Sequence, residues 1–139
     1  MNVQISKYRK VQKPRVSNCK EEKKRLLPIY GAFSIKSALP GRVTFAQINA
    51  AKKTIKKVIK KNGVIWQIVF ADRPVTSKPA EVRMGKGKGA FSHNVAILLA
   101  GTTLFELGGP SLSMKLAYQA FLQANYKLGL PLKFSLRLS

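Results

Sequence analysis

The chain has 139 residues, which suits one compact domain and is short for two. Its 26 Lys and Arg residues against 5 Asp and Glu give a formal net charge of +21, far more than solubility requires. Such a charge needs a polyanion to neutralise it, and nucleic acid is the commonest one because phosphate contacts release counterions. A hydrophobic fraction of 45% rules out a purely disordered basic tail.

Several other classes of protein fit the sequence poorly. The single cysteine, Cys19, can build neither a disulfide framework nor a cysteine-rich zinc site, and we expect a free thiol. We find no run near the ~20 apolar residues that a membrane helix needs. The first residues lack the apolar core of a secretory signal. We therefore expect no membrane association.

Residues 1–27 are predicted to form an extended basic N-terminal arm, followed by a single domain at 28–139. The arm lacks apolar periodicity, which argues against an isolated helix. Tyr8 lies among cations, where it could stack on a base while its neighbours bind phosphates. A solvated, disordered tail is the alternative, but the charge excess favours an arm that orders on RNA.

The first strand is expected within residues 28–37, where Tyr30, Phe33 and Ile35 are the apolar anchors. Pro40-Gly41 then predicts a turn.

The clearest helix is predicted for residues 44–62. Thr44 suits the N-cap, and Gln47 three residues later completes a capping box. Asn62-Gly63 is expected to end the helix in a left-handed turn. Residues at helical spacing predict its buried stripe: Phe45, Ile48, Ala51, Ile55, Val58 and Ile59.

The same helix carries six lysines with no carboxylate three or four residues away: Lys52, Lys53, Lys56, Lys57, Lys60 and Lys61. They could simply be solvated. In a chain of this charge we expect at least some of them to contact phosphate groups.

Residues 64–70 are apolar nearly throughout and predict a strand that is buried on both faces, or nearly so. Trp66 is therefore expected in the core rather than as a platform for a base. Asp72-Arg73-Pro74 should end the strand, and residues 75–94 are predicted to be a long basic loop.

Residues 95–99 and 103–107 are expected to be two strands joined as a hairpin by Ala100-Gly101-Thr102. A second helix is predicted at 112–128, capped by Ser111 or Ser113 and ended by Gly129. Its buried stripe should be Leu112, Leu116, Ala120, Phe121 and Ala124.

Alternation over residues 132–138 predicts a final, half-exposed strand. The predicted fold class is α+β, with two helices packed on a mixed or mostly antiparallel sheet and an extended basic N-terminal arm.

The loop centre is Arg83-Met84-Gly85-Lys86-Gly87-Lys88-Gly89. Alternating glycines let a backbone approach its partner closely, and the lysines between them attract anions. The spacing matches neither a P-loop nor a dinucleotide-binding fingerprint. A flexible tip without a role is the alternative.

An enzyme is not expected. His93 is the only histidine, and the carboxylates are scattered along the chain. We find no set of residues that suits a metal and no nucleophile paired with a base. His93 is more consistent with a loop residue or an RNA contact. The sequence therefore predicts no catalytic residue, metal or cofactor.

The sequence resembles the bacterial-type large-subunit ribosomal protein sixteen family, which is related to the archaeal and eukaryotic ten-e family. The most specific matching segment is Lys78 to Gly89, KPAEVRMGKGKG. The other matching segments are Lys7-Tyr8-Arg9-Lys10, Tyr30-Gly31-Ala32-Phe33, Gly41-Arg42-Val43-Thr44, Gly63-Val64-Ile65-Trp66 and Val69 to Thr76. The sequence departs from the family pattern after Arg15 and matches it only loosely from Gly108.

The resemblance implies an α/β-hammerhead-like domain in the large ribosomal subunit. It implies binding to large-subunit rRNA, contact with neighbouring ribosomal proteins, and a place beside the aminoacyl-site tRNA and the peptidyl transferase centre. The residues expected to bind rRNA are Lys7, Tyr8, Arg9, Lys10, Lys13, Arg15, Arg42, Lys52, Lys53, Lys56, Lys57 and Lys60. The loop expected near the tRNA comprises Lys78, Arg83, Met84, Gly85, Lys86, Gly87, Lys88 and Gly89.

The departures from the family pattern and the Lys, Ile and Leu bias favour a ribosome of the mitochondrial matrix, with the bacterial cytoplasm or a plastid as alternatives. We do not expect a homo-oligomer. A free-standing RNA-binding or chaperone-like module is the alternative to a permanent ribosome component.

Overall fold

The computed structural model describes residues 8–14, 21–22 and 27–137, so Lys7, Arg15 and Cys19 lie outside the described residues. Seven strands and two helices follow in the order β1 (Phe33–Ser37), β2 (Gly41–Thr44), α1 (Phe45–Ile59), β3 (Val64–Gln67), β4 (Arg73–Ser77), β5 (Ala90–Leu98), β6 (Thr103–Gly108), α2 (Met114–Leu128) and β7 (Leu132–Leu136). None of the described helices is long and apolar enough to cross a bilayer.

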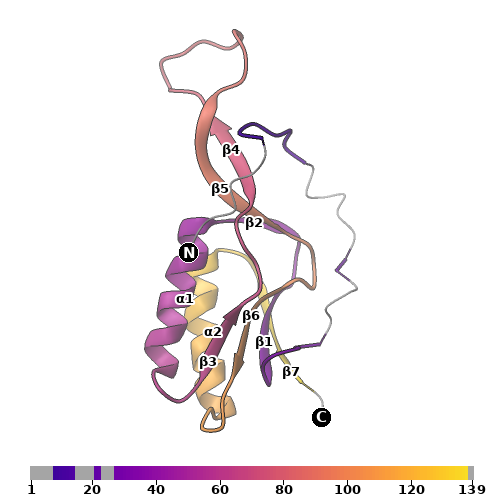
Figure 1. The fold of residues 1–139 in the computed structure, drawn as a ribbon, viewed down its shortest axis with the longest axis vertical. Helices are drawn as coiled ribbons and strands as arrows, with labels where there is room; N and C mark the ends of the chain where they lie inside the picture. The colour runs from indigo at the N-terminus through magenta and orange to yellow at the C-terminus, as the bar shows by residue number, and fades with distance from the viewer. Residues whose placement is uncertain (1–7, 15–20, 23–26, 138–139) are drawn as a thin grey trace.

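The predicted α+β class is confirmed, with the strands divided between two sheets. The larger sheet has the order β3-β6-β1-β7, the smaller has the order β2-β5-β4, and neighbouring strands are antiparallel. In Figure 1, α1 and α2 lie side by side against the larger sheet, while β4 and β5 extend away from this body. The molecule is therefore elongated, with the hairpin at one end.

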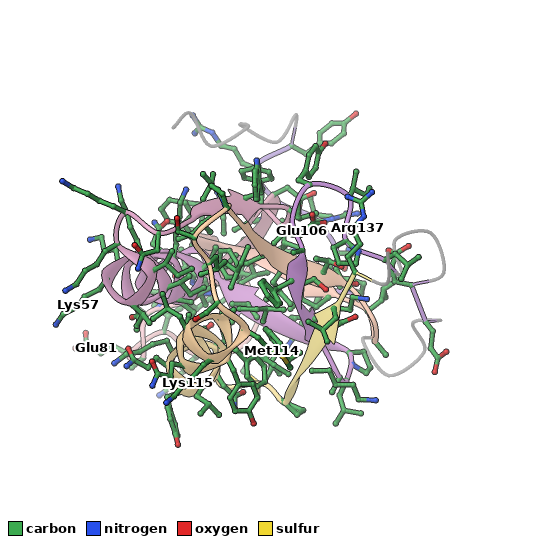
Figure 2. All side chains as sticks on the ribbon, turned by 90° about the horizontal axis from the view of Figure 1, so that it is seen from below. Lys57, Glu81, Glu106, Met114, Lys115 and Arg137 are labelled. Atoms are coloured by element: carbon green, nitrogen blue, oxygen red, sulfur yellow. The ribbon has the colours of Figure 1, made fainter. Side chains whose placement is uncertain are left out.

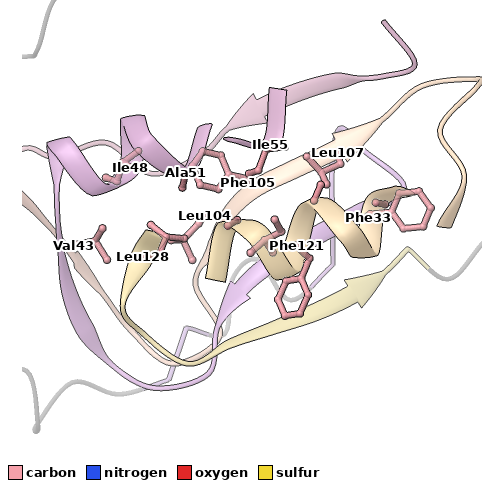
Figure 3. Close-up of a cluster of buried hydrophobic side chains, with 14 of the residues drawn as sticks. Phe33, Val43, Ile48, Ala51, Ile55, Leu104, Phe105, Leu107, Phe121 and Leu128 are labelled. Atoms are coloured by element: carbon pink, nitrogen blue, oxygen red, sulfur yellow. The ribbon is translucent and has the colours of Figure 1, made fainter. Parts of the chain in front are cut away.

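The core lies between the helix pair and the larger sheet (Figure 3). Ile35 and Phe105 are fully buried and face each other across β1 and β6, so they belong to the sheet face that the helices cover. From the helices, Ile48, Ile55 and Ala120 enter the same cluster. Burying each large aliphatic side chain stabilises the fold by about 1.5–3 kcal/mol.

Helix α1 begins as predicted and ends differently. The Thr44 hydroxyl accepts from the backbone N–H of Gln47 at 3.3 Å, and the Gln47 side chain accepts from the N–H of Thr44 at 2.8 Å. The predicted left-handed stop at Asn62-Gly63 is wrong, because Lys60 takes the positive φ, 52°. Gly63 instead lets strands approach, since a Cβ there would meet the carbonyl oxygen of Gly108 at 3.0 Å.

The predicted stripe on α1 is largely confirmed. Ile48, Ala51, Ile55 and Ile59 are buried, while Phe45 is exposed and Val58 is half-buried. For α2, Ser113 is the N-cap and Gly129 is left-handed with φ 65°, as predicted.

The prediction of a strand buried on both faces at residues 64–70 is wrong. Strand β3 ends at Gln67 and lies at the edge of its sheet. Val64 and Phe70 are each more than half exposed. Trp66 is half-buried and stacks on Tyr30 at a ring-centroid distance of 6.3 Å. The helices cover only one face of the sheet, so an apolar edge strand stays partly open.

The predicted hairpin between residues 95–99 and 103–107 is also wrong. Strand β5 pairs with β2 and β4, whereas β6 pairs with β1 and β3. The connecting turn is closed locally, since Thr102 donates its backbone N–H to the carbonyl of Leu99 at 3.1 Å, but it also bonds to β1. Ser37 accepts from the N–H of Gly101 at 2.8 Å and donates to the carbonyl of Thr102 at 2.9 Å. With φ of 86° at Gly101, the chain crosses from one sheet to the other.

The predicted loop at 75–94 is shorter in the structure, because β4 runs to Ser77 and β5 starts at Ala90. Pro74 is tolerated within β4 because that strand forms an edge of its sheet. The sequence also gave no sign of β2, since Pro40-Gly41 predicted only a turn.

Glu106 is buried in β6, on the sheet face that the helices leave uncovered. Its carboxylate accepts three backbone N–H bonds, from Ile29 at 3.0 Å, Tyr30 at 2.6 Å and Gly31 at 3.1 Å. Arg137 donates to the carbonyl of Ile29 at 3.2 Å, and Figure 2 shows it beside Glu106. These contacts fix the point at which the arm enters the body.

Lys36 on neighbouring β1 is nearly buried. Burial lowers its pKa, and the negative charge of Glu106 partly opposes that shift. The negative charge of Glu106 therefore favours the protonated form of Lys36, in addition to accepting from the three backbone N–H groups.

We predict that Glu106→Gln lowers the free energy of unfolding by about 2–4 kcal/mol, because three backbone N–H donors lose a charged acceptor and Lys36 loses a nearby negative charge. Urea denaturation measures this. Glu81→Gln is the matched control, since Glu81 is exposed on the hairpin and its loss should change stability by less than about 0.5 kcal/mol. Equal stability of the two variants would contradict the role of Glu106.

Candidate nucleic-acid interface

The hairpin of β4 and β5 carries the basic segment at its tip, residues 78–89, at the far end of the molecule from the α1–β3 connection (Figure 1). Nearly every residue of the tip is exposed, and Met84 is 100% exposed. The first four residues of β5 are exposed as well. A segment held this far from the core is placed to contact a partner and contributes little to packing.

The glycines of the tip have two different structural roles, one conformational and one steric. Gly85 and Gly87 have φ of 94° and 90°, which favours glycine, although a Cβ there would meet nothing within 4 Å. Lys86 between them also has a positive φ, 53°. Gly89 has a steric role, since a Cβ would lie 2.4 Å from the carbonyl oxygen of Ser77. The glycines thus shape the turn and close its base.

Lysine side chains of the hairpin brace the tip and the arm. Lys78 donates to the carbonyl of Gly85, across the tip. Lys88 donates to the carbonyl of Val11 in the arm at 2.6 Å, and Lys10 of the arm donates to the carbonyl of Lys88 at 3.1 Å. The arm and the tip therefore hold each other by reciprocal contacts.

A third contact fixes the arm on the smaller sheet, since Arg42 of β2 donates to the carbonyl of Pro14. Tyr8 and Arg9 at the start of the described arm are exposed, as is Lys13. The structure therefore brings together the described part of the arm, Arg42 and Lys88 at the base of the tip, while the rest of the tip projects beyond the arm (Figure 1).

The arm does not pack tightly on the smaller sheet. A hollow of about 360 Å³ separates residues 11–14 from the outward face of β2, β5 and β4. Arg73, Lys88 and His93 are among the residues that line it. Sequence reasoning missed Arg73, because the strand break expected at Asp72-Arg73-Pro74 concealed its place in β4.

The lysines of α1 form a separate basic surface. Lys53, Lys56, Lys57 and Lys60 are exposed, whereas Lys52 is half-buried and donates to the side chain of Gln67 at 3.2 Å. In the view of Figure 2, Lys57 points outward from the helix, on the side away from Glu106. These side chains run along a helix flank, so they could follow a phosphate backbone.

The described residues contain no group of three His, Cys, Asp or Glu side chains that could hold a metal. His93 has the hydroxyl of Ser92 beside its Nδ1 at 3.1 Å, and both residues are exposed. In the described chain, the buried carboxylate of Glu106 is engaged with backbone N–H groups. The geometry offers exposed cations for an anionic polymer.

Comparison with known proteins agrees with this geometry. The model of the ribosomal protein L16p/L10e family matches residues 3–135. The large ribosomal subunit protein uL16m of Marchantia polymorpha is 46% identical over 129 residues, covering 93% of each chain. The uL16 protein of Halorhodospira halophila is 43% identical over 123 residues, covering 88% of this chain and 87% of its own.

A third relative, uL16c of Gracilaria tenuistipitata, is 39% identical over 129 residues and is covered to the same extent, 93% of each chain. The family-model match over residues 3–135 spans the arm, the body and the hairpin tip. On this coverage and identity, the chain belongs to the ribosomal protein L16p/L10e family.

Proposed function

We propose that this chain is a structural constituent of the large ribosomal subunit that binds rRNA and helps to shape the aminoacyl-tRNA site near the peptidyl transferase centre. The observation that carries the proposal is the segment Arg83 to Gly89, which the fold displays at the end of a projecting hairpin. The relatives of the chain are named as large ribosomal subunit proteins, which supports the proposal.

The arm and the α1 lysines would bind rRNA through phosphate contacts. Lys53, Lys56 and Lys57 are exposed on one helix. Phosphate contacts position a protein without reading base sequence, so recognition would depend on the shape of the RNA. We place the α1 lysines and the arm against rRNA and the tip toward aminoacyl-site tRNA.

The exposed charge of the tip supports this division. Arg83 and Lys86 are exposed, and Met84 between these cations is fully exposed. The reciprocal bonds of Lys10 and Lys88 tie the tip to the arm, so rRNA binding by the arm would orient the tip. The protein would thereby position the surrounding rRNA and tRNA without catalysing a reaction.

A mitochondrial ribosome is the proposed location. The relative from Marchantia polymorpha is named uL16m and is 46% identical, against 43% for the bacterial uL16 and 39% for the uL16c. Large-subunit rRNA and neighbouring ribosomal proteins are the proposed partners. Fractionation of tagged protein with the mitochondrial large subunit tests the location, and recovery in another compartment would overturn it.

The competing function is a free-standing RNA-binding module. Co-sedimentation separates the two, because a ribosome constituent stays with large subunits through a high-salt wash at one copy per subunit. Release into the wash would favour the free-standing module.

We predict that the full-length chain binds a large-subunit rRNA fragment with a steep salt dependence. If six to ten phosphates are contacted, affinity should fall by about 10³–10⁵ between 50 and 200 mM salt. Filter binding across this range measures the slope. A flat response would contradict binding through phosphate contacts.

We predict that Arg83→Ala with Lys86→Ala leaves folding intact, within about 0.5 kcal/mol, because both side chains are exposed on the tip. Subunits carrying the variant should assemble but accept aminoacyl-tRNA more slowly. A single-turnover assay of tRNA accommodation measures this rate. Lys88 is left intact because it also holds the arm.

Lys115→Ala with Lys127→Ala is the matched control, because it removes two exposed cations on α2, remote from the hairpin tip. Equal accommodation rates for the tip variant and the control would refute the role of the tip.

A further inference from the structure

The outward face of the smaller sheet places cations over an apolar floor. Strand register puts Val95 of β5 opposite both Thr44 of β2 and Arg73 of β4, and His93 opposite Val75. Because side chains alternate along a strand, these residues share one face. The opposite face of β5 carries Ala96 and Leu98 into the core.

The arm roofs this face without filling it. Val11, Gln12 and Pro14 form the roof of the hollow of about 360 Å³. Its floor includes Val75, Val95 and Ile97, and among the described residues its rim carries four cations and no carboxylate. The rim cations are Lys13, Arg42, Arg73 and Lys88.

Two contacts keep rim cations at the opening. Arg42 donates to Pro14 and Lys88 donates to Val11, both through backbone carbonyls of the arm. A guanidinium carries five N–H donors and an ammonium three, so among the described contacts each keeps donors for a phosphate.

The apolar floor and the cationic rim together favour a ligand that has both a flat apolar part and a negative charge. A free phosphate would satisfy the cations but leave the apolar floor uncovered. A purely apolar ligand would leave four cations facing it unpaired. A nucleotide has both parts, a flat ring for the floor and a phosphate for the rim. The volume lies at the small end of the ~300–1,000 Å³ typical of ligand sites.

Polar side chains at the edge of the floor could recognise the base. Thr76 and His93 line the hollow and offer both donors and acceptors. RNA is read in sequence mainly through unpaired bases that leave the stack and settle on aromatic or guanidinium planes. The His93 ring and the Arg73 guanidinium supply such planes here.

We infer that the hollow between residues 11–14 and the β2-β5-β4 sheet holds one unstacked nucleotide of RNA, with its base on Val75 and Val95 and its phosphate at Arg42, Arg73 and Lys88. This inference rests on the proposed rRNA binding and deepens it. A base held under the arm would lock the arm and hairpin to the RNA at a defined nucleotide.

The experiment titrates the isotopically labelled full-length chain with each of the four nucleoside 5′-monophosphates, and with inorganic phosphate, while following amide and methyl NMR signals. At least one nucleotide should shift Val75, Val95 and His93 saturably. Inorganic phosphate should shift the rim alone and bind at least about tenfold more weakly. Equal responses to nucleotide and inorganic phosphate would overturn the inference in favour of a plain anion site.

Arg73→Gln should weaken nucleotide binding by at least about tenfold, because it removes a charge-assisted contact. Lys115→Gln is the matched control, since it removes one exposed positive charge on α2 and should leave nucleotide binding within about twofold. Equal effects of the two variants would overturn the inference. The methyl spectrum of each variant shows whether it is folded.

Binding of an rRNA fragment is measured on the same samples. If the fragment binds with a steep salt slope while no nucleotide shifts the hollow, the inference fails and the proposed function stands. If neither binds, the proposed function fails too.

Discussion

The carboxylate of Glu106 is the interaction on which the arrangement of the chain depends. It is an acid among many cations, yet it is buried and accepts three consecutive backbone N–H groups at residues 29–31. That contact sets where the arm leaves the body. Gly31 is required there, because a Cβ would lie 2.4 Å from the carbonyl oxygen of Leu107.

Local signals in the sequence predicted the local parts of the fold. The capping box of Thr44 and Gln47, the stripe of α1 and the stop at Gly129 were all readable, because each depends on residues a few positions apart. The sequence did not reveal that β5 and β6 belong to different sheets. A three-residue connection suggests a hairpin, but Gly101 and Thr102 bond to Ser37, more than sixty residues earlier.

For the candidate site, too, the local features were predictable from the sequence and the long-range contacts were not. The basic arm, the α1 lysines and the tip were evident from composition and spacing. The bond from Lys10 to the carbonyl of Lys88 joins segments 78 residues apart, and no periodicity reveals such a contact. Arg73 was concealed because a proline beside it suggested a strand break, whereas an edge strand tolerates proline.

Because the tip lies far from the core, cellular quality control should not detect chains that carry a defective tip. The described core cluster draws no residue from 78–89. Replacing an exposed side chain of the tip such as Arg83 or Lys86 therefore changes the folded population little, and chaperones and proteases act on unfolded chains. Such copies would escape quality control and be incorporated into subunits. Selection against a defective tip would then act only on the performance of assembled ribosomes.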